Sequence, residues 1–171
     1  IQHYQADPEL RAMLLIALVV GLLVSLQLWL GGRFDGFGES LRHGMFQAIS
    51  NVSNNGYVTT DYSQWPGAAP LLLLLVAFIG GCSGSTSGGM KVARWQMLVR
   101  QALREIRQLV HPKGQFVVKV GGKRVSESVV ISVGGFFTLY LLSFVVLVLI
   151  LAAAGVEAGT ATYAIAACLN N

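Results

Sequence analysis

The stretch SLRHGMFQAISNVSNNGYV, residues 40–58, is the segment that the rest of the chain is predicted to support. Its first part predicts a helix over residues 40–52, with Ser40 as a possible N-cap and apolar residues at spacings of three and four. About twelve helical residues cover only ~18 Å, whereas a hydrocarbon core is roughly 30 Å thick. The helix can therefore enter a membrane without crossing it, and Gly56 allows the chain to turn back. Taken alone, the same residues also fit a surface hairpin of a soluble protein.

The composition favours the membrane. Of the 171 residues, 54% are hydrophobic and 12% are charged, and the mean hydropathy is +0.61. Such a chain is too apolar for an ordinary soluble domain, so we expect an integral membrane protein in contact with lipid. Nine of the twelve Lys and Arg residues fall between residues 91 and 124, which predicts that residues 91–127 are cytoplasmic. Because apolar segments flank this basic stretch, we expect no binding to nucleic acid.

A half-helix that ends in polar residues and glycine is the pattern of a re-entrant pore loop. Non-helical backbone persists at membrane depth only when it is buried in protein or lines a wet cavity. A cavity lined by backbone carbonyls binds dehydrated cations. We therefore predict an ion-selectivity filter over residues 53–58. The residues predicted to form it are Ser53, Asn54, Asn55, Gly56 and Tyr57.

Two apolar segments flank this loop. Residues 12–30 predict a transmembrane helix, and residues 68–110 predict a second helix that is interrupted after residue 79. The interruption contains five glycines, each of which costs about 1 kcal/mol relative to alanine inside a helix. On the path from outside to inside it follows the filter, so we expect it to act as an intramembrane gate with low local stability. The residues of this predicted gating loop are Gly80, Gly81, Cys82, Ser83, Gly84, Ser85, Thr86, Ser87, Gly88 and Gly89.

The gating loop contains two patterns that imitate catalytic motifs. GSTSGGMK lacks the Gly-Lys-Ser/Thr ending of a phosphate-binding loop, because Met90 precedes Lys91 and Val92 follows it. The serines do not satisfy Gly-x-Ser-x-Gly either, and no histidine or carboxylate lies near in sequence. We therefore predict no catalytic residue and no enzymatic activity. Cys82 and Cys168 are expected to be free thiols, neither metal ligands nor a disulfide.

The remaining residues predict a cytoplasmic loop followed by membrane segments. Within residues 111–127, alternation around Gly121 and Gly122 predicts a β-hairpin. Residues 128–154 predict a transmembrane helix, and residues 160–169 predict a short helix for which Thr160 can be the cap.

The end of the chain repeats its opening unit. At a separation of 116 residues, the pair Asn170 and Asn171 matches the asparagine pair of the first filter segment, so both are assigned to a second filter segment. The predicted fold is an all-α membrane protein built from helix, pore-loop, helix repeats with a short cytoplasmic hairpin. Residues 1–110 form one repeat, residues 111–127 the loop, and residues 128–171 the start of the next repeat. Since two filter segments do not enclose an ion as four do, we expect a piece of a longer pore protein.

The motifs SNNGYVTTDYSQWP, FIGGCSGSTSGGMKVAR and AACLNN resemble the Trk/Ktr/HKT superfamily of potassium transporters, most closely its TrkH type. The resemblance covers essentially the whole chain and implies four repeats, of which residues 12–110 are the third and residues 128–171 the start of the fourth. It also implies that Gly56 is the filter glycine and that the glycine-rich loop lies across the pore beneath the filter.

The resemblance implies potassium uptake across the inner (plasma) membrane of a bacterium by a multi-pass protein, with potassium as the transported substrate and no covalent cofactor. It further implies a homodimer and a cytosolic nucleotide-binding regulatory protein of the TrkA type, for which the basic residues between Arg100 and Arg124 offer a contact surface. A sodium-selective relative and a secondary transporter for an organic solute are alternatives, because transporters also build sites at broken helices. Two short helices that both end in an asparagine pair favour the pore.

Overall fold

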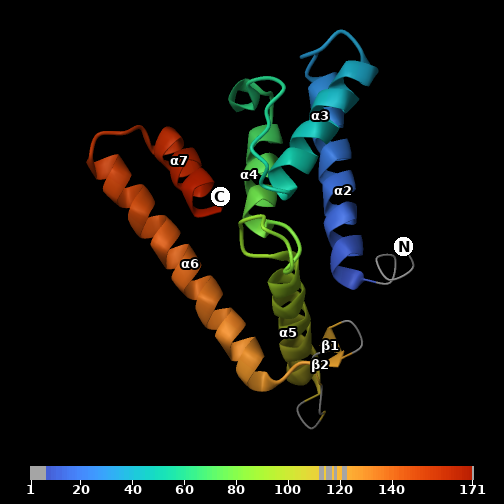
Figure 1. The fold of residues 1–171 in the computed structure, drawn as a ribbon, viewed down its shortest axis with the longest axis vertical. Coiled ribbons are helices and arrows are strands. Elements are labelled where there is room, and N and C mark those ends of the chain that lie inside the picture. Colours follow the sequence, from blue (N-terminus) through green and yellow to red (C-terminus); the bar gives the residue numbers. More distant parts are fainter. Residues whose placement is uncertain (1–6, 112–113, 115–116, 118, 121–122, 171) are drawn as a thin grey trace.

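The computed structural model describes residues 7–170 except residues 112–113, 115–116, 118 and 121–122. Helices α2, α3 and α4 lie together, α5 continues below α4, and α6 runs obliquely from the lower end of α5 up to α7 (Figure 1). The elements are α2 (Pro8–Leu30), α3 (Phe37–Val52), the 3-10 helix η1 (Tyr62–Gln64), α4 (Ala69–Ile79), α5 (Val92–Val110), β1 (Lys119–Val120), β2 (Lys123–Arg124), α6 (Glu127–Ala153) and α7 (Ala158–Asn170).

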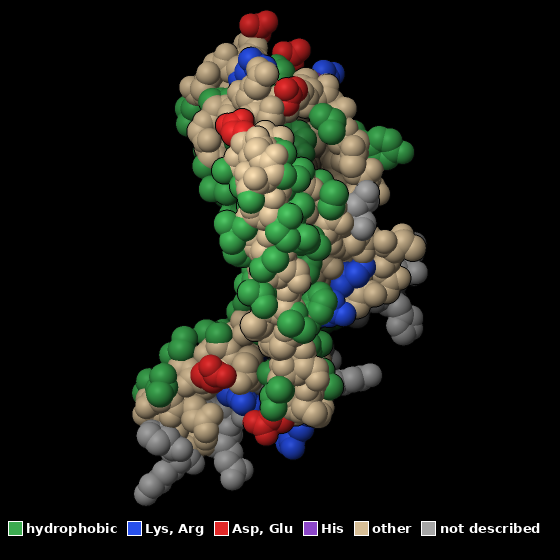
Figure 2. Space-filling model, turned by 90° about the vertical axis from the view of Figure 1, so that its left-hand side faces the viewer, with side chains coloured by type: hydrophobic (Ala, Val, Ile, Leu, Met, Phe, Trp, Pro, Cys, Tyr) green, Lys and Arg blue, Asp and Glu red, His purple; other side chains and the backbone are tan. Residues whose placement is uncertain are grey.

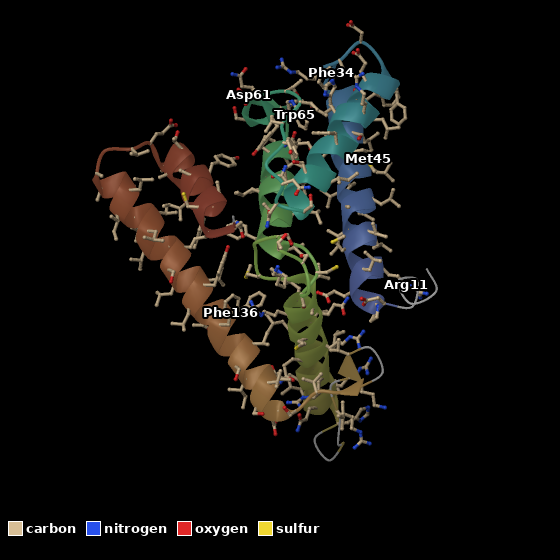
Figure 3. The ribbon with its side chains drawn as sticks, viewed as in Figure 1. Arg11, Phe34, Met45, Asp61, Trp65 and Phe136 are labelled. Atoms are coloured by element: carbon tan, nitrogen blue, oxygen red, sulfur yellow. The ribbon has the colours of Figure 1, made fainter. Side chains whose placement is uncertain are left out.

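Helix α3 lies directly along α2 because two glycines remove side-chain bulk from their interface. Gly21 of α2 faces Met45 of α3, which points toward α2 in Figure 3. A Cβ atom on Gly44 would lie 2.8 Å from the backbone nitrogen of Ser25 and 2.9 Å from its Cα atom. The Ser25 hydroxyl is fully buried and donates to the Gly21 carbonyl at 2.6 Å. The position of α3 is therefore fixed by contact with the α2 backbone.

Both short helices begin earlier than the sequence predicts. Helix α3 begins at Phe37 with Gly36 at the N-cap, so Ser40 lies within the first turn and is not the cap. The Ser40 side chain is instead completely buried, where its oxygen has no partner among the described residues. Helix α7 begins at Ala158, so Thr160 is likewise a first-turn residue and not a cap. Burial against neighbouring helices competes with capping, and sequence rules for N-caps do not include it.

A compact core joins α2, α3 and α4. Its fully buried members include Val24 and Leu28 from α2, Ala48 from α3 and Leu73 from α4. Trp65, which follows η1, covers this core and is 4% exposed (Figure 3). The core therefore holds the C-terminal half of α3 and the start of α4 at a fixed separation.

Helices α6 and α7, here called the second arm (Figure 1), are attached to α4 and α5 through aromatic contacts. Met90, Val133 and Phe137 form a buried cluster between the start of α5 and α6. Phe78 at the end of α4 meets the ring of Phe144 edge to face, with ring centres 5.1 Å apart. Lower down, the Arg94 guanidinium of α5 lies 4.2 Å from the ring centre of Phe136 on α6 (Figure 3). These contacts place α6 and α7 beside α4 and α5.

Strands β1 and β2 pair in antiparallel fashion, with Lys119 opposite Arg124 and Val120 opposite Lys123. The Arg100 guanidinium of α5 donates to the Lys119 carbonyl, so the strands lie beside α5 at the lower end of the molecule (Figure 1). Gly121 and Gly122, the predicted turn, lie outside the described residues. In the space-filling view, charged side chains lie at the upper end and in the lower half, with hydrophobic side chains between them (Figure 2).

Two helices of the described chain, α2 and α6, are long and apolar enough to cross a membrane by length and composition. Helix α4 is apolar but has only 11 residues, and the chain leaves helical geometry before α5 begins. The predicted broken helix is therefore two separate helices joined by the glycine-rich loop, residues 80–89. Large apolar side chains on the outer faces of α2 and α6 are exposed in the chain by itself.

Candidate ion pathway

The chain reverses direction immediately after α3, in residues 53–58, here called the asparagine loop. Asn54 adopts a φ of 52° and Gly56 a φ of 71°, both in the left-handed region. The Asn55 amide donates to the Ser50 carbonyl at 3.1 Å, which closes the end of the helix. The backbone therefore turns at the depth where α3 ends, near the middle of the molecule (Figure 1).

Ser50 holds the returning chain in place. Its hydroxyl donates to the Tyr57 carbonyl at 2.7 Å, and its side chain is 6% exposed. Tyr57 itself is 68% exposed. Sequence reasoning missed Ser50, because a serine in the last turn of a helix gives no sign that it donates to a carbonyl seven residues ahead. The shape of the asparagine loop thus depends on a hydroxyl outside the predicted filter.

Gly56 faces open space. A Cβ atom built on it would meet no other atom within 4 Å, so crowding does not explain the glycine. Its positive φ does, since other L-residues adopt that region at a cost. A side chain at residue 56 would therefore extend into the adjoining space without displacing protein.

A cavity of about 190 Å³ separates the asparagine loop from the second arm. It brings together the predicted residues Asn54, Gly56 and Asn170, which come from opposite sides. The last turns of α3 and α7 both border it, and the C-terminal end of a helix carries partial negative charge. Such an environment attracts a cation without any carboxylate. The lining residues are Ser50, Asn51, Asn54, Gly56, Tyr62, Leu74, Ala77, Tyr163, Ala166, Ala167 and Asn170.

The Asn170 side chain is already engaged on the α6 side of this cavity. Its Oδ1 atom accepts from the Tyr140 hydroxyl at 2.7 Å, and its Nδ2 atom donates to the Ala166 carbonyl at 2.7 Å. It is 3% exposed. Asn170 therefore fastens the end of α7 to α6, a role that the sequence did not predict. Asn171, the other predicted residue of the second filter segment, lies outside the described residues.

The glycine-rich loop has a closed neck. Gly80 and Gly89 have φ values of 71° and 76°, and a Cβ atom on Gly89 would lie 2.8 Å from the Gly80 Cα atom. Above and below this contact, the Met90 amide donates to the Phe78 carbonyl at 3.0 Å and the Val92 amide to the Gly81 carbonyl at 3.1 Å. The two ends of the loop therefore lie side by side, and the loop projects from the junction between α4 and α5.

Hydroxyl groups and one ammonium group form hydrogen bonds with polar groups inside the loop. The Ser85 hydroxyl lies 2.7 Å from the Cys82 carbonyl, to which it donates, and 2.6 Å from the Ser87 hydroxyl. The Lys91 ammonium donates to the Ser85 carbonyl at 2.9 Å and also to the Ser87 carbonyl. These bonds hold the loop more firmly than its glycine content predicts.

A second cavity, of about 320 Å³, lies between the asparagine loop and the glycine-rich loop. The two predicted elements are thus neighbours in space although about 30 residues separate them in sequence. The loop residues that do not line this cavity are Gly80, Ser83, Gly84 and Gly89. The lining residues are Met13, Ser53, Asn54, Asn55, Gly81, Cys82, Ser85, Thr86, Ser87 and Gly88.

At the η1 end, Asp61 supplies negative charge beside a third hollow that Tyr62, Thr160 and Tyr163 also line. Hydrogen bonds from the Ser63 hydroxyl and amide lower the pKa of Asp61, so it stays ionised at neutral pH. Burial raises the pKa of Tyr62, which keeps that phenol neutral. Among the described residues, no group of three or more His, Cys, Asp and Glu side chains is suited to a metal ion.

The sequence profile of the TrkH family, described as a cation transport protein, matches residues 2–171. The chain belongs to the TrkH family. It is 40% identical to the Trk system potassium uptake protein TrkH of Halomonas elongata over 99% of this chain and 35% of that protein. It is 45% identical to TrkG of Escherichia coli K12 over 96% of this chain and 34% of that protein.

The fold is also that of the family. The crystal structure of the potassium transporter TrkH from Vibrio parahaemolyticus matches with a TM-score of 0.90 and 40% identity, over 97% of this chain and 36% of that one. The predicted resemblance to the Trk potassium transporters is therefore confirmed, and the matched relatives are membrane transporters. The chain spans about a third of the length of the curated relatives it matches.

Proposed function

We propose that this chain forms one side of a pore through which potassium enters a bacterial cell across its inner membrane. The asparagine loop supplies backbone carbonyls to the selectivity filter, and the segment that begins at Asn170 and Asn171 supplies an equivalent set. Repeats outside this chain complete the ring. Potassium is the transported substrate, and the names of the relatives, potassium uptake proteins, support that assignment.

The observation that carries the proposal is the meeting of two half-helices at one cavity. The last turns of α3 and α7 border it from opposite sides, and the chain turns back at Gly56. Helix C-termini and backbone carbonyls stabilise a cation that has lost its water, without binding it as tightly as carboxylates would. At about 190 Å³, this cavity is smaller than the roughly 300–1,000 Å³ of typical sites for organic ligands, and its size supports a small cation.

The glycine-rich loop is the gate in this proposal. It borders the cavity beneath the asparagine loop, and its single neck lets the loop move as a unit. The hydroxyl and ammonium contacts within it define one of its two positions. A partner that moves α5 can shift the balance between them.

The cytoplasmic end carries the surface for that partner. Arg100, Arg104 and Arg107 of α5 and Lys119 and Arg124 of the paired strands are the basic residues there. The salt bridge between Arg104 and Glu127, 3.6 Å long, joins α5 to α6. We assign this surface to a cytosolic nucleotide-binding regulatory protein of the TrkA type, in a complex built on a homodimer of the full-length protein. The Trk system named for the relatives supports a multi-component assembly.

Ion flux tests the proposal. The full-length protein, purified and reconstituted into liposomes, should carry potassium down its gradient, and sodium more slowly. Rubidium, which is close to potassium in size, should compete. Uptake of an organic solute in place of potassium would contradict the proposed pore. It would favour the hypothesis that the broken helix belongs to a secondary transporter.

A further inference from the structure

The N-terminal turn of α2 reaches the glycine-rich loop from outside the loop's own helices. Glu9, in that turn, places its Oε1 atom 2.5 Å from the Ser83 amide nitrogen and 2.9 Å from the Ser83 hydroxyl, both of which donate to it. Ser83 lies 74 residues further along the chain. It is on the flank of the loop and does not line the cavity beneath the asparagine loop. The carboxylate therefore holds the loop from the side, away from the ion path.

The same oxygen also contacts α5. The Ala93 amide, in the first turn of α5, donates to Glu9 Oε1 at 3.2 Å. Helix α5 has no capping side chain of its own and no acidic residue in its first turn. A carboxylate near a helix N-terminus stabilises the free amides and the positive end of the helix dipole. Glu9 thus supplies from α2 the cap that the sequence of α5 lacks.

Neighbouring contacts keep the two helix ends together. The Gln96 side chain donates to the Pro8 carbonyl at 3.1 Å, and Cys82 Sγ lies 3.7 Å from Met13 Sδ. Asp7 caps α2 through a hydrogen bond from the Glu9 amide to its carboxylate, at 2.9 Å, which orients the turn that carries Glu9. The Glu9 carboxylate is therefore positioned by the α2 cap on one side and by α5 on the other.

We propose that Glu9 is the positioning residue that keeps the glycine-rich loop in the observed position and links it to α5. One oxygen serves both the loop and the helix end, so a displacement of α5 relative to α2 weakens the hold on Ser83. The inference rests on the gating role proposed for the loop. It adds the element through which movement of α5 reaches the loop.

Accessibility of Cys82 reports the loop position independently of ion flux. In inside-out vesicles containing the full-length protein without its regulatory partner, Cys82 is alkylated by a charged thiol reagent, and the labelled peptide is quantified by mass spectrometry. Glu9→Ala should raise the labelling rate by about tenfold, as expected for the loss of hydrogen bonds to a charged group. Glu9→Gln, which keeps an oxygen acceptor but not the charge, should raise it by about threefold.

Glu39 provides the matched control, because it occupies the first turn of α3 as Glu9 occupies that of α2, at the opposite end of the fold. Glu39→Ala should leave Cys82 labelling unchanged. Ser83→Ala removes one donor alone and should give a smaller rise than Glu9→Ala, which keeps the test open if Glu9→Ala folds poorly. Equal labelling in the parent, Glu9→Gln and Ser83→Ala would overturn the proposal. Faster labelling without faster ion flux would support the restraint by Glu9 and contradict the gating role of the loop.

Discussion

Gly56→Ser should raise the permeability of sodium relative to potassium by about tenfold, which corresponds to ~1.4 kcal/mol of lost discrimination. The φ of 71° at residue 56 costs a non-glycine residue of order 1–3 kcal/mol. That cost is relieved by rotating the adjoining peptide groups, whose carbonyls then leave the geometry that suits potassium. Because a Cβ atom at residue 56 meets no protein atom, the variant should still fold and insert.

Gly32→Ser is the control for backbone strain. Gly32 has a φ of 62° and equally open surroundings, but it lies in the connection between α2 and α3. The Gly32→Ser variant should have a similar conformational cost and keep the permeability ratio of the parent protein. Measurement of reversal potentials under mixed sodium and potassium gradients compares the three proteins. A ratio in Gly56→Ser that equals that of Gly32→Ser would remove Gly56 from the filter.

Deletion of residues 84–87 should raise potassium flux by about tenfold, a change of ~1.4 kcal/mol in the barrier. The deletion removes Ser85 and Ser87, whose carbonyls accept from Lys91, and shortens the part of the loop that borders the lower cavity. It leaves the neck between Gly80 and Gly89 in place. Flux should also stop responding to the regulatory partner, since the element that the partner moves is gone.

Selectivity is the internal control for this variant. Two hydrogen bonds shape the asparagine loop, one between Ser50 and Asn55 and one between Ser50 and Tyr57, and neither involves the deleted residues. The sodium-to-potassium permeability ratio should therefore match that of the parent. A variant that inserts normally but conducts no faster, and still responds to the partner, would show that the loop is not the barrier.

The short helix before the asparagine loop and the interruption after α4 follow from local rules, namely apolar spacing, helix length and glycine content. The predicted start of α3 was wrong by three residues, because Ser40 is buried by packing that a capping rule does not take into account. Boundaries depend on neighbours, whereas the existence of a helix depends mainly on its own residues.

The contacts that hold the site together are long-range, and no local sequence pattern predicts them. Glu9 reaches Ser83 across 74 residues and Tyr140 reaches Asn170 across 30. Neither glutamate in a first helical turn nor tyrosine in an apolar helix is unusual, so no local pattern marks them. That the glycine-rich loop follows the asparagine loop on the path into the cell was predicted from the course of the chain, and the family resemblance implied the same order. Their shared cavity gives it a geometric basis.

Anomalous scattering from a heavy potassium substitute can locate the cation that the proposed filter binds. Crystals of the full-length protein grown with thallium(I) should show an anomalous peak in the cavity between α3 and α7, within ligand distance of backbone carbonyls of the asparagine loop. Excess potassium should remove the peak, and excess sodium should not. An empty cavity, with the thallium peak instead at the break between α4 and α5, would contradict the proposed filter.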